Sequence, residues 1–335
     1  MSAVFIAAAL VLAFATSFLV TPYIQRLALN VGMLDETGER RMHDQPKPRI
    51  GGIAVYLGFA FALFSALGYL FNQHALHGTR DLQNVHDVVG LIFGGTLICM
   101  LGVWDDVMGM SPRAKLIAQV VVAGISMLYG FLISYVNNPF HHGDIIYFPL
   151  WLSIVITLVW YVGMMNAINF IDGLDGLLPG LTAIAGMFLL VINLTHGHPE
   201  IALVLAALVG GALGFLPYNY NPAKIILGDS GALFIGYVFA TVSIIGASKT
   251  AFTISLLVPL VVLGLPIVDT AAAIVRRTRA GRKIYEADRG HFHHQLIFRF
   301  GLNVRQAVLL IYALCVALGV LALVLSGGLG ALKLA

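Results

Sequence analysis

Residues 149–176 read PLWLSIVITLVWYVGMMNAINFIDGLDG, an apolar run that ends in a cluster of amides, carboxylates and glycines. The first part, 149–167, contains no charged residue. It is long enough to cross a bilayer, since about 20 apolar residues span the hydrocarbon layer as a helix. The second part, Asn166–Gly176, is polar and rich in glycine. The stretch therefore predicts a transmembrane helix that runs into a polar segment at one face of a membrane.

The same alternation of apolar runs and polar breaks continues along the whole chain. The sequence is 59% hydrophobic and 10% charged, whereas a soluble domain carries roughly a quarter charged residues. Because lipid cannot satisfy backbone groups, the apolar runs are expected to be helices. We therefore predict an all-α, polytopic membrane protein with a single domain over residues 1–335. Ten stretches are expected to span the membrane: 3–23, 51–71, 88–104, 114–135, 149–167, 177–195, 200–216, 231–247, 252–274 and 304–327.

The distribution of basic residues predicts the orientation of these spans. With both termini outside, every Lys and Arg lies inside except Arg80, Lys249 and Lys333, as the positive-inside rule favours. Most carboxylates, amides and histidines then gather inside as well, which topology alone does not require. A site for an anionic, phosphorylated substrate at the cytoplasmic face is therefore expected. Five inner segments would form it: Asp35–Gly52, Trp104–Lys115, Asn166–Gly176, Pro217–Gly231 and Arg276–Arg305.

Composition excludes several other classes of protein. The net charge of +3 is too small to indicate nucleic-acid binding. Cys99 and Cys315 lie inside apolar stretches, so they predict neither a disulfide framework nor a cysteine metal site. The first stretch lacks a basic leading region and is followed by many others, which favours a retained helix over a signal peptide.

Asp105 and Asp106 end the third apolar stretch. Paired carboxylates at the end of a span are costly unless they are solvated, paired or bound to a cation. Ser111 and Pro112 then predict a helix start, with the serine capping and the proline at the first helical position. Lys115 follows in the first turn. The motif can hold a metal and a phosphate, or its charged groups can simply be solvated at the membrane surface.

Asn166, Asn169, Asp172 and Asp175 recur every three residues, so they share one broad face if the fifth helix continues through them. Carboxylate and amide oxygens suit Mg²⁺, which keeps water and often shares substrate phosphates. Glycines between them let the backbone turn or approach a ligand closely. This pattern is the strongest indication of a functional site in the chain.

Asp229 stands between two glycines in Leu227-Gly228-Asp229-Ser230-Gly231, at the expected start of the eighth span. The amino end of a helix favours anions, including phosphate, although a plain helix cap explains an isolated motif equally well.

The most basic inner loop contains Asp288-Arg289-Gly290-His291-Phe292-His293-His294. These groups can contact phosphate or sugar, since arginine binds phosphate with two hydrogen bonds and histidine moves protons. Loop structure and a zinc site remain alternatives. Lys47 and Arg49 either line a phosphate entrance or solvate a turn. Asp269, inside the ninth stretch, is expected to pair structurally with a basic group.

Together these motifs resemble the polyprenyl-phosphate N-acetylhexosamine-1-phosphate transferases. This superfamily also includes the bacterial phospho-MurNAc-pentapeptide translocase and the eukaryotic dolichyl-phosphate GlcNAc-1-phosphate transferase. The likeness runs from about Asp35 to His294, in family order. The His-Phe-His-His cluster is similar to the bacterial undecaprenyl-phosphate GlcNAc-1-phosphate branch. One departure is Ile226, where several members have a phenylalanine that stacks on uracil.

The resemblance implies roles for individual residues. It implies catalysis by Asp105, Asp106, Asp172 and His291, and metal binding by Asn169 and Asp229. Substrate contacts are expected from Lys115, Asn166, Asp175, His293, His294, Arg289, Lys47 and Arg49. The implied cofactor is Mg²⁺, with Mn²⁺ as a substitute.

The implied activity is that of a phosphotransferase in a bacterial inner membrane. It would move an N-acetylhexosamine 1-phosphate, GlcNAc 1-phosphate first, from a UDP-sugar to undecaprenyl phosphate and release UMP. This is a first step of glycan synthesis for the cell envelope, such as lipopolysaccharide O-antigen or teichoic acid. Direct attack by the lipid phosphate and a covalent phospho-aspartate both remain open. Translocase-type transfer and, from another class, a transporter are the alternatives. Related enzymes often form homodimers.

Overall fold

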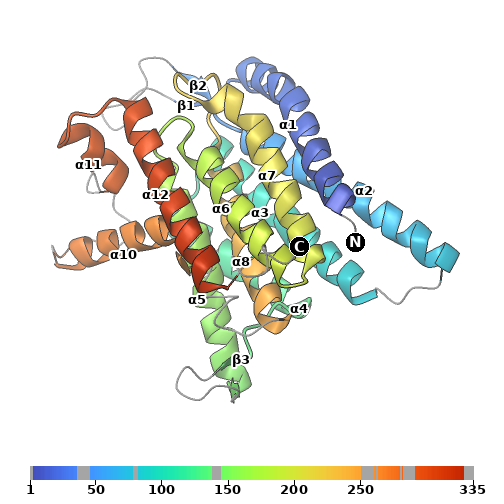
Figure 1. Cartoon of the computed structure of the whole chain (residues 1–335). Helices are drawn as coiled ribbons and strands as arrows, with labels where there is room; N and C mark the ends of the chain where they lie inside the picture. Colours follow the sequence, from blue (N-terminus) through green and yellow to red (C-terminus); the bar gives the residue numbers. More distant parts are fainter. Residues whose placement is uncertain are drawn as a thin grey trace.

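Helices make up nearly all of the chain that the computed structural model describes, namely residues 3–35, 46–77, 82–137, 145–249, 260–261, 263–279, 281 and 291–327. Figure 1 shows them as a bundle with its helices inclined to one another. The helices are α1 (Ala3–Val31), α2 (Gly52–His77), α3 (Leu82–Met108), α4 (Pro112–Leu128), α5 (Leu150–Ile171), α6 (Leu177–Thr195), α7 (Pro199–Asn219), α8 (Gly228–Lys249), α10 (Gly264–Arg279), α11 (Phe292–Phe298) and α12 (Val304–Leu325).

Two short antiparallel strand pairs depart from the all-α prediction. Strand β1 (Leu34–Asp35) pairs with β2 (Lys47–Pro48), and β3 (Tyr135–Asn137) pairs with β4 (Ile145–Tyr147). Strands of two or three residues leave no periodic pattern in a sequence, which is why they were not predicted. Figure 1 places β1, β2 and α11 toward one end of the bundle and β3 at the other.

The central element is α8. It packs against α2, α3, α5, α6 and α7, and its apolar span is almost entirely buried. A helix that is hydrophobic on every face belongs in such a place. Gly236 allows a close contact with α5, because a Cβ there would press against the backbone of Met164 and Met165. The amino end of α8 is thereby held next to the carboxyl end of α5.

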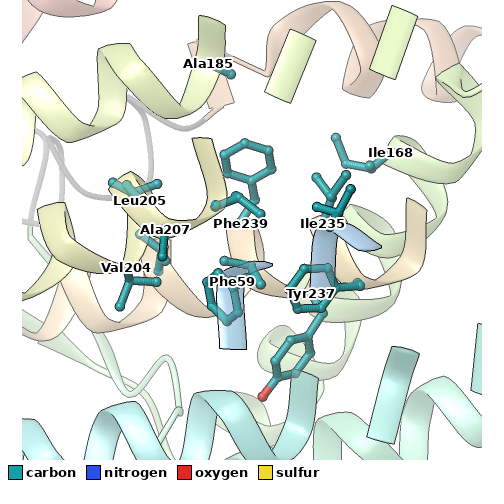
Figure 2. Packing of buried hydrophobic residues seen from close by; sticks show 14 of the residues in the cluster. Phe59, Ile168, Ala185, Val204, Leu205, Ala207, Ile235, Tyr237 and Phe239 are labelled. Atoms are coloured by element: carbon teal, nitrogen blue, oxygen red, sulfur yellow. The ribbon is translucent and has the colours of Figure 1, made fainter. Parts of the chain in front are cut away.

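Side chains from five helices fill the core around α8. Figure 2 shows Phe59 of α2, Ile168 of α5, Leu205 of α7 and Phe239 of α8 packed together. Each of these side chains is buried. Several polar atoms in this core are paired, which lowers the cost of burying them. The hydroxyl of Tyr237, for instance, lies 2.9 Å from Oγ of Ser126.

Eight described helices are long and apolar enough to cross a membrane, and they correspond to eight of the ten predicted stretches. The stretch 114–135 forms the 17-residue α4, which ends where Gly130 takes a positive φ of 84°. At 1.5 Å per residue, α4 is about 26 Å long, shorter than the hydrocarbon layer of about 30 Å. Of the stretch 252–274, residues 252–259 and 262 lie outside the described residues.

Candidate active site

The amino end of α8 forms the floor of the predicted site. Gly228 takes a positive φ of 76° immediately before Asp229, a conformation that glycine adopts without steric cost. A Cβ on Gly52 or Gly102 would overlap the backbone of residues 229–231. These two glycines therefore allow the start of α2 and the end of α3 to touch the first turn of α8.

Asp106, at the end of α3, caps this first turn. Its Oδ1 accepts the N–H of Asp229 at 2.8 Å, and its Oδ2 accepts the N–H of Ser230 at 3.0 Å. Arg49 Nε lies 2.9 Å from the same carboxylate, whose side chain is fully buried. All three donors are therefore satisfied within the protein. This geometry gives Asp106 the task of positioning Asp229 and Arg49, while its predicted part in catalysis stays a prediction.

Asp229 is the point where three other elements meet. Lys115 Nζ of α4 lies 2.9 Å from its Oδ1, and Arg49 lies 3.1 Å from its Oδ2. The side-chain amide of Asn169, on α5, also donates to Oδ1. The predicted metal ligands Asp229 and Asn169 thus come together.

Asp105 holds Lys115 from the other side. Its Oδ2 lies 2.8 Å from Lys115 Nζ, and its Oδ1 accepts the N–H of Met110 at 2.7 Å. The predicted cap is confirmed, since the side chain of Ser111 accepts the N–H of Ala114 and Pro112 opens α4. The turn between α3 and α4 therefore delivers one carboxylate and one ammonium group to the site.

Backbone pairing brings the N-terminal polar segment here. The N–H groups of Gly51 and Gly52 donate to Ile226 and Leu227, and the N–H of Ile226 donates to Pro48 at 2.8 Å. Arg49 and Ile226 form a parallel bridge. Ile226 is thus next to Arg49, which contacts both Asp106 and Asp229.

The predicted stripe of amides and carboxylates does not stay on one helix face, because α5 ends at Ile171. Asn166 donates to Gln119 of α4 at 2.7 Å and to its own helix. Asp175 accepts from Lys47 at 3.0 Å, from Asn221 at 3.1 Å and from the N–H of Ala223 at 2.9 Å. These contacts fix α4 and the loop after α7 around the site.

Asp172 differs from the other carboxylates. Its side chain makes no hydrogen bond or ion pair with any residue that the structure describes, although its backbone N–H donates to the carbonyl oxygen of Asn169. Part of its surface is accessible, but the carboxyl group lies deep among protein atoms. Burial, together with the carboxylates of Asp229 and Asp106, raises the pKa of Asp172 to about 8. A cation near this group would remove the repulsion.

His291 and Asp269 form a buried pair, which confirms the prediction that Asp269 pairs with a basic group. Nδ1 of His291 lies 2.9 Å from Oδ2 of Asp269, and Nε2 lies 3.5 Å from a guanidinium nitrogen of Arg277. Arg277 also lies over the ring of Phe170, 5.6 Å from its centre. Both ring nitrogens of His291 are therefore engaged inside the protein.

His293 is buried with neither ring nitrogen partnered among the described residues. Its Nε2 points at Gly173, where a Cβ would collide with it. Burial, with His294 and His291 beside it, lowers the pKa of His293 to about 3, so the ring is neutral at physiological pH. A buried polar group without a partner usually has a functional reason. His294 packs against His293, and Arg289 lies outside the described residues.

The charges in this cluster do not balance within the described residues. The carboxylates are Asp105, Asp106, Asp172, Asp175 and Asp229, and the cations in contact with them are Lys47, Arg49 and Lys115. Two negative charges are in excess when all five carboxylates are ionised, and one when Asp172, with its raised pKa, is protonated. Such a set fits a divalent cation, because carboxylate and amide oxygens are the ligands that Mg²⁺ prefers.

No three described His, Cys, Asp or Glu side chains are already arranged as a complete metal site. A zinc site at His291, His293 and His294 therefore gains no support in this part of the chain. Mg²⁺ needs fewer protein ligands, since it usually keeps several waters and binds one or two carboxylates plus substrate phosphates. Asp229 and Asn169 meet that smaller requirement.

Sequence reasoning missed the part that Gln119 and Arg277 play. Gln119 follows Lys115 by four residues, so it shares a helix face with it. Arg277 follows Asp269 by about two helical turns. The basic residues of this segment were used only to predict which side of the membrane it lies on. In both cases a polar residue within an apolar helix face was the available signal.

We predict that Asp106→Ala lowers stability as well as activity. It leaves Arg49 and two helix N–H groups without their acceptor, and breaking a buried ion pair costs about 3–5 kcal/mol. The melting temperature in detergent should fall by roughly 5 °C or more. A variant that melts like the wild type would contradict the positioning role.

Comparisons with known proteins agree with this geometry. A family model described as glycosyl transferase family 4 matches residues 88–247. A "probable undecaprenyl-phosphate N-acetylglucosaminyl 1-phosphate transferase" from Bacillus subtilis is 33% identical over 321 residues, which cover 96% of this chain and 85% of the relative. A decaprenyl-phosphate N-acetylglucosaminephosphotransferase from Mycolicibacterium smegmatis is 35% identical over 315 residues, covering 88% of this chain and 76% of the relative.

An undecaprenyl-phosphate alpha-N-acetylglucosaminyl 1-phosphate transferase from Escherichia coli is 29% identical over 317 residues, which cover 92% of this chain and 81% of the relative. These three relatives cover between 88% and 96% of this chain. This chain belongs to the polyprenyl-phosphate N-acetylhexosamine-1-phosphate transferases of glycosyl transferase family 4.

Proposed function

We propose that this protein transfers an N-acetylhexosamine 1-phosphate, GlcNAc 1-phosphate first, from a UDP-sugar to undecaprenyl phosphate and releases UMP. The observation that carries the proposal is the cluster around Asp229, where α3, α4, α5, α8 and the residue that follows β2 bring an excess of negative charge next to Lys115 and Arg49. The names of the relatives support the sugar phosphate and the polyprenyl acceptor.

Asp229 and Asn169 would hold Mg²⁺ or Mn²⁺. Such an ion, when bound, neutralises charge on a diphosphate and on its leaving group. The side chains divide the remaining work. Lys115 and Arg49 are anchored by Asp105 and Asp106 and can turn their remaining donors to phosphate oxygens. His293, neutral and unpartnered among the described residues, can donate one hydrogen bond to the substrate.

The lipid phosphate would attack the phosphorus that carries the sugar. One P–O bond forms there, the P–O bond to UMP breaks, and UMP keeps the bridging oxygen. The bond between the sugar's C1 and its oxygen survives, so the anomeric configuration is retained. A phosphate monoester has a second pKa near 6 and is mostly dianionic at neutral pH. It therefore needs little help from a base, and Asp105 or Asp172 would serve mainly to orient it.

A groove between α5 and α10 offers a place for the apolar tail. It has a volume of about 430 Å³ and is lined almost wholly by apolar side chains, among them Val159, Ala167 and Ile267. Ala167 is two residues from Asn169 in the sequence, so the groove opens close to the cluster. We propose that the polyprenyl chain lies here with its phosphate toward Asn169.

Transport is less well supported. A transporter would place acids near mid-depth in several spans. The described carboxylates within the candidate spans lie close to helix ends: Asp87, Asp105, Asp106, Glu200 and Asp229.

The reaction can be tested with detergent-purified protein, UDP-GlcNAc, undecaprenyl phosphate and Mg²⁺. We expect UMP to be released only when the lipid phosphate is present and the divalent cation has not been chelated. A parallel series of UDP-N-acetylhexosamines identifies the preferred sugar. Absence of UMP with every UDP-sugar would reject the proposal.

We predict that Gly163→Phe raises the KM for undecaprenyl phosphate about tenfold, equivalent to about 1.4 kcal/mol of binding. Gly163 lines the groove, and nothing lies within 4 Å of where its Cβ would be, so the ring should fill the groove without disturbing the helix. Gly124→Phe on α4 is the matched control, because its Cβ position is equally open and lies away from the groove. Equal KM values for the two variants would place the lipid elsewhere.

A further inference from the structure

Asp269 lies on α10 and is buried, and both of its carboxylate oxygens are engaged. Oδ2 lies 2.9 Å from Nδ1 of His291. Oδ1 accepts the N–H of Phe292, the first residue of α11, also at 2.9 Å. One carboxylate therefore fixes both the ring of His291 and the start of the helix that carries His293 and His294.

These contacts determine which nitrogen of His291 carries the proton. A carboxylate can only accept, so Nδ1 donates to Asp269. A guanidinium can only donate, so Nε2 of His291 is the acceptor toward Arg277 at 3.5 Å. The geometry therefore selects the neutral tautomer with its proton on Nδ1. Asp269 holds the proton on Nδ1, and Arg277 supports the same tautomer from the Nε2 side.

The chain of contacts ends beside the predicted metal ligands. The ring of Phe170 lies 5.9 Å from that of His291 and beneath the guanidinium of Arg277. Phe170 directly follows Asn169, which contacts Asp229. On the other side, the ring of His293 stacks on His291 at 5.7 Å. The position of His291 thus influences both Arg277 and His293.

We infer that Asp269 is a positioning residue for the transfer reaction, acting through the tautomer of His291 to place Arg277 and His293 at the carboxyl end of α5. This inference rests on the proposed function. Two residues of α10, Asp269 and Arg277, thus have different roles, which the sequence alone does not distinguish. Asp269 touches no substrate, while Arg277 brings the positive charge that a phosphate requires.

The test compares Asp269→Asn, His291→Asn and the double variant in the UMP-release assay. Asparagine keeps the shape of Asp269, but its amide group can donate a hydrogen bond and so no longer selects the tautomer. We expect kcat to fall about 100-fold in each single variant, with the KM for the UDP-sugar changed less than threefold. Because Asp269 acts through His291, the double variant should be no more than threefold worse than His291→Asn alone.

Asp87→Asn is the matched control. Asp87 also pairs with a histidine, His86, at 3.7 Å, but near the opposite end of α3 from Asp105. It should keep the wild-type kcat. Multiplicative losses in the double variant, or an unchanged kcat in Asp269→Asn, would overturn the inference. Loss of UMP release in the wild type would instead reject the proposed function, so the two failures are distinguishable.

A second measurement does not depend on the folding of Asp269→Asn. In wild-type protein labelled with ¹⁵N-histidine, the signals of His291 can be assigned by their disappearance in His291→Asn. Their chemical shifts should report a proton on Nδ1 and an unprotonated Nε2. A proton on Nε2 alone would overturn the inference even if every variant were inactive.

Discussion

Asp229→Asn is expected to reduce kcat by about 10³-fold or more while leaving the melting temperature within a few degrees of the wild type. Removing a single preorganised charge contact in an active site commonly costs 10²–10³-fold, and under the proposed function the same carboxylate would also be a metal ligand. The substitution removes one negative charge from the cluster. It also turns an amide toward Lys115 or Arg49, both of which only donate.

The fold should survive because the main-chain contacts of Asp229 do not depend on its side chain. Its N–H still donates to Asp106, and Gly228 and Ser230 are unchanged. Glu200→Gln, at the start of α7, is a suitable control for loss of a carboxylate away from the cluster. The account would be wrong if Asp229→Asn kept more than a tenth of the wild-type rate.

Asp172→Asn should have the second largest effect: it should lower the rate of transfer and raise the stability of the metal-free protein. Transfer should fall at least about 100-fold, because the substitution removes a carboxylate whose side chain has no described ion-pair partner and would be free to act on the substrate. The metal-free protein should nevertheless melt at a higher temperature than the wild type. Asparagine has no charge to bury beside Asp229 and Asp106, whereas Asp172 has.

The stability that Asp172→Asn gains over the wild type depends on pH, because the pKa of Asp172 differs between the folded and unfolded states. The pKa of Asp172 is raised to about 8 in the folded protein from its ordinary value of 3.8. The wild type therefore loses stability relative to the variant as pH rises from about 4 to about 8, and the difference is constant above that. Melting curves at pH 6 and pH 9 should show the larger gain at pH 9. Added Mg²⁺ should reverse the order by stabilising the wild type more. A variant that is less stable at both values would contradict this account.

Local patterns predicted the pieces of the site well. The turn from Asp105 to Lys115 was predicted from the Ser111-Pro112 helix start, and the structure confirms that cap. The concentration of acids, amides and histidines in inner segments predicted that they would meet. The described carboxylates do meet, since Asp105, Asp106 and Asp229 are joined through Lys115 and Arg49.

The different tasks of neighbouring residues could not be predicted. Asp105 and Asp106 are adjacent and chemically identical, yet Asp106 caps α8 and Asp105 holds Lys115. That difference depends on where α8 begins in space, more than 120 residues later in the chain. The pairing of Asp269 with His291 likewise depends on how α10 and α11 lie against each other, which no spacing in the sequence records.

The stripe from Asn166 to Asp175 shows how a correct pattern can predict the wrong geometry. Spacing by three residues predicts one face only if the helix continues. The helix ends at Ile171, and the chain then turns through Gly173 and Gly176, which has a positive φ of 82°. The side chains of Asn166, Asn169 and Asp175 consequently face α4, α8 and the loop after α7.

The binding of Mn²⁺ to purified, metal-free protein, followed by electron paramagnetic resonance, tests the central claim most directly. The claim is that Asp229 and Asn169 hold a divalent cation that the nucleotide diphosphate shares. We predict a single Mn²⁺ site that UDP-GlcNAc tightens and that both Asp229→Asn and Asn169→Ala weaken at least tenfold, whereas Glu200→Gln does not. Mn²⁺ binding that is indifferent to these two substitutions and to UDP-GlcNAc would contradict the account.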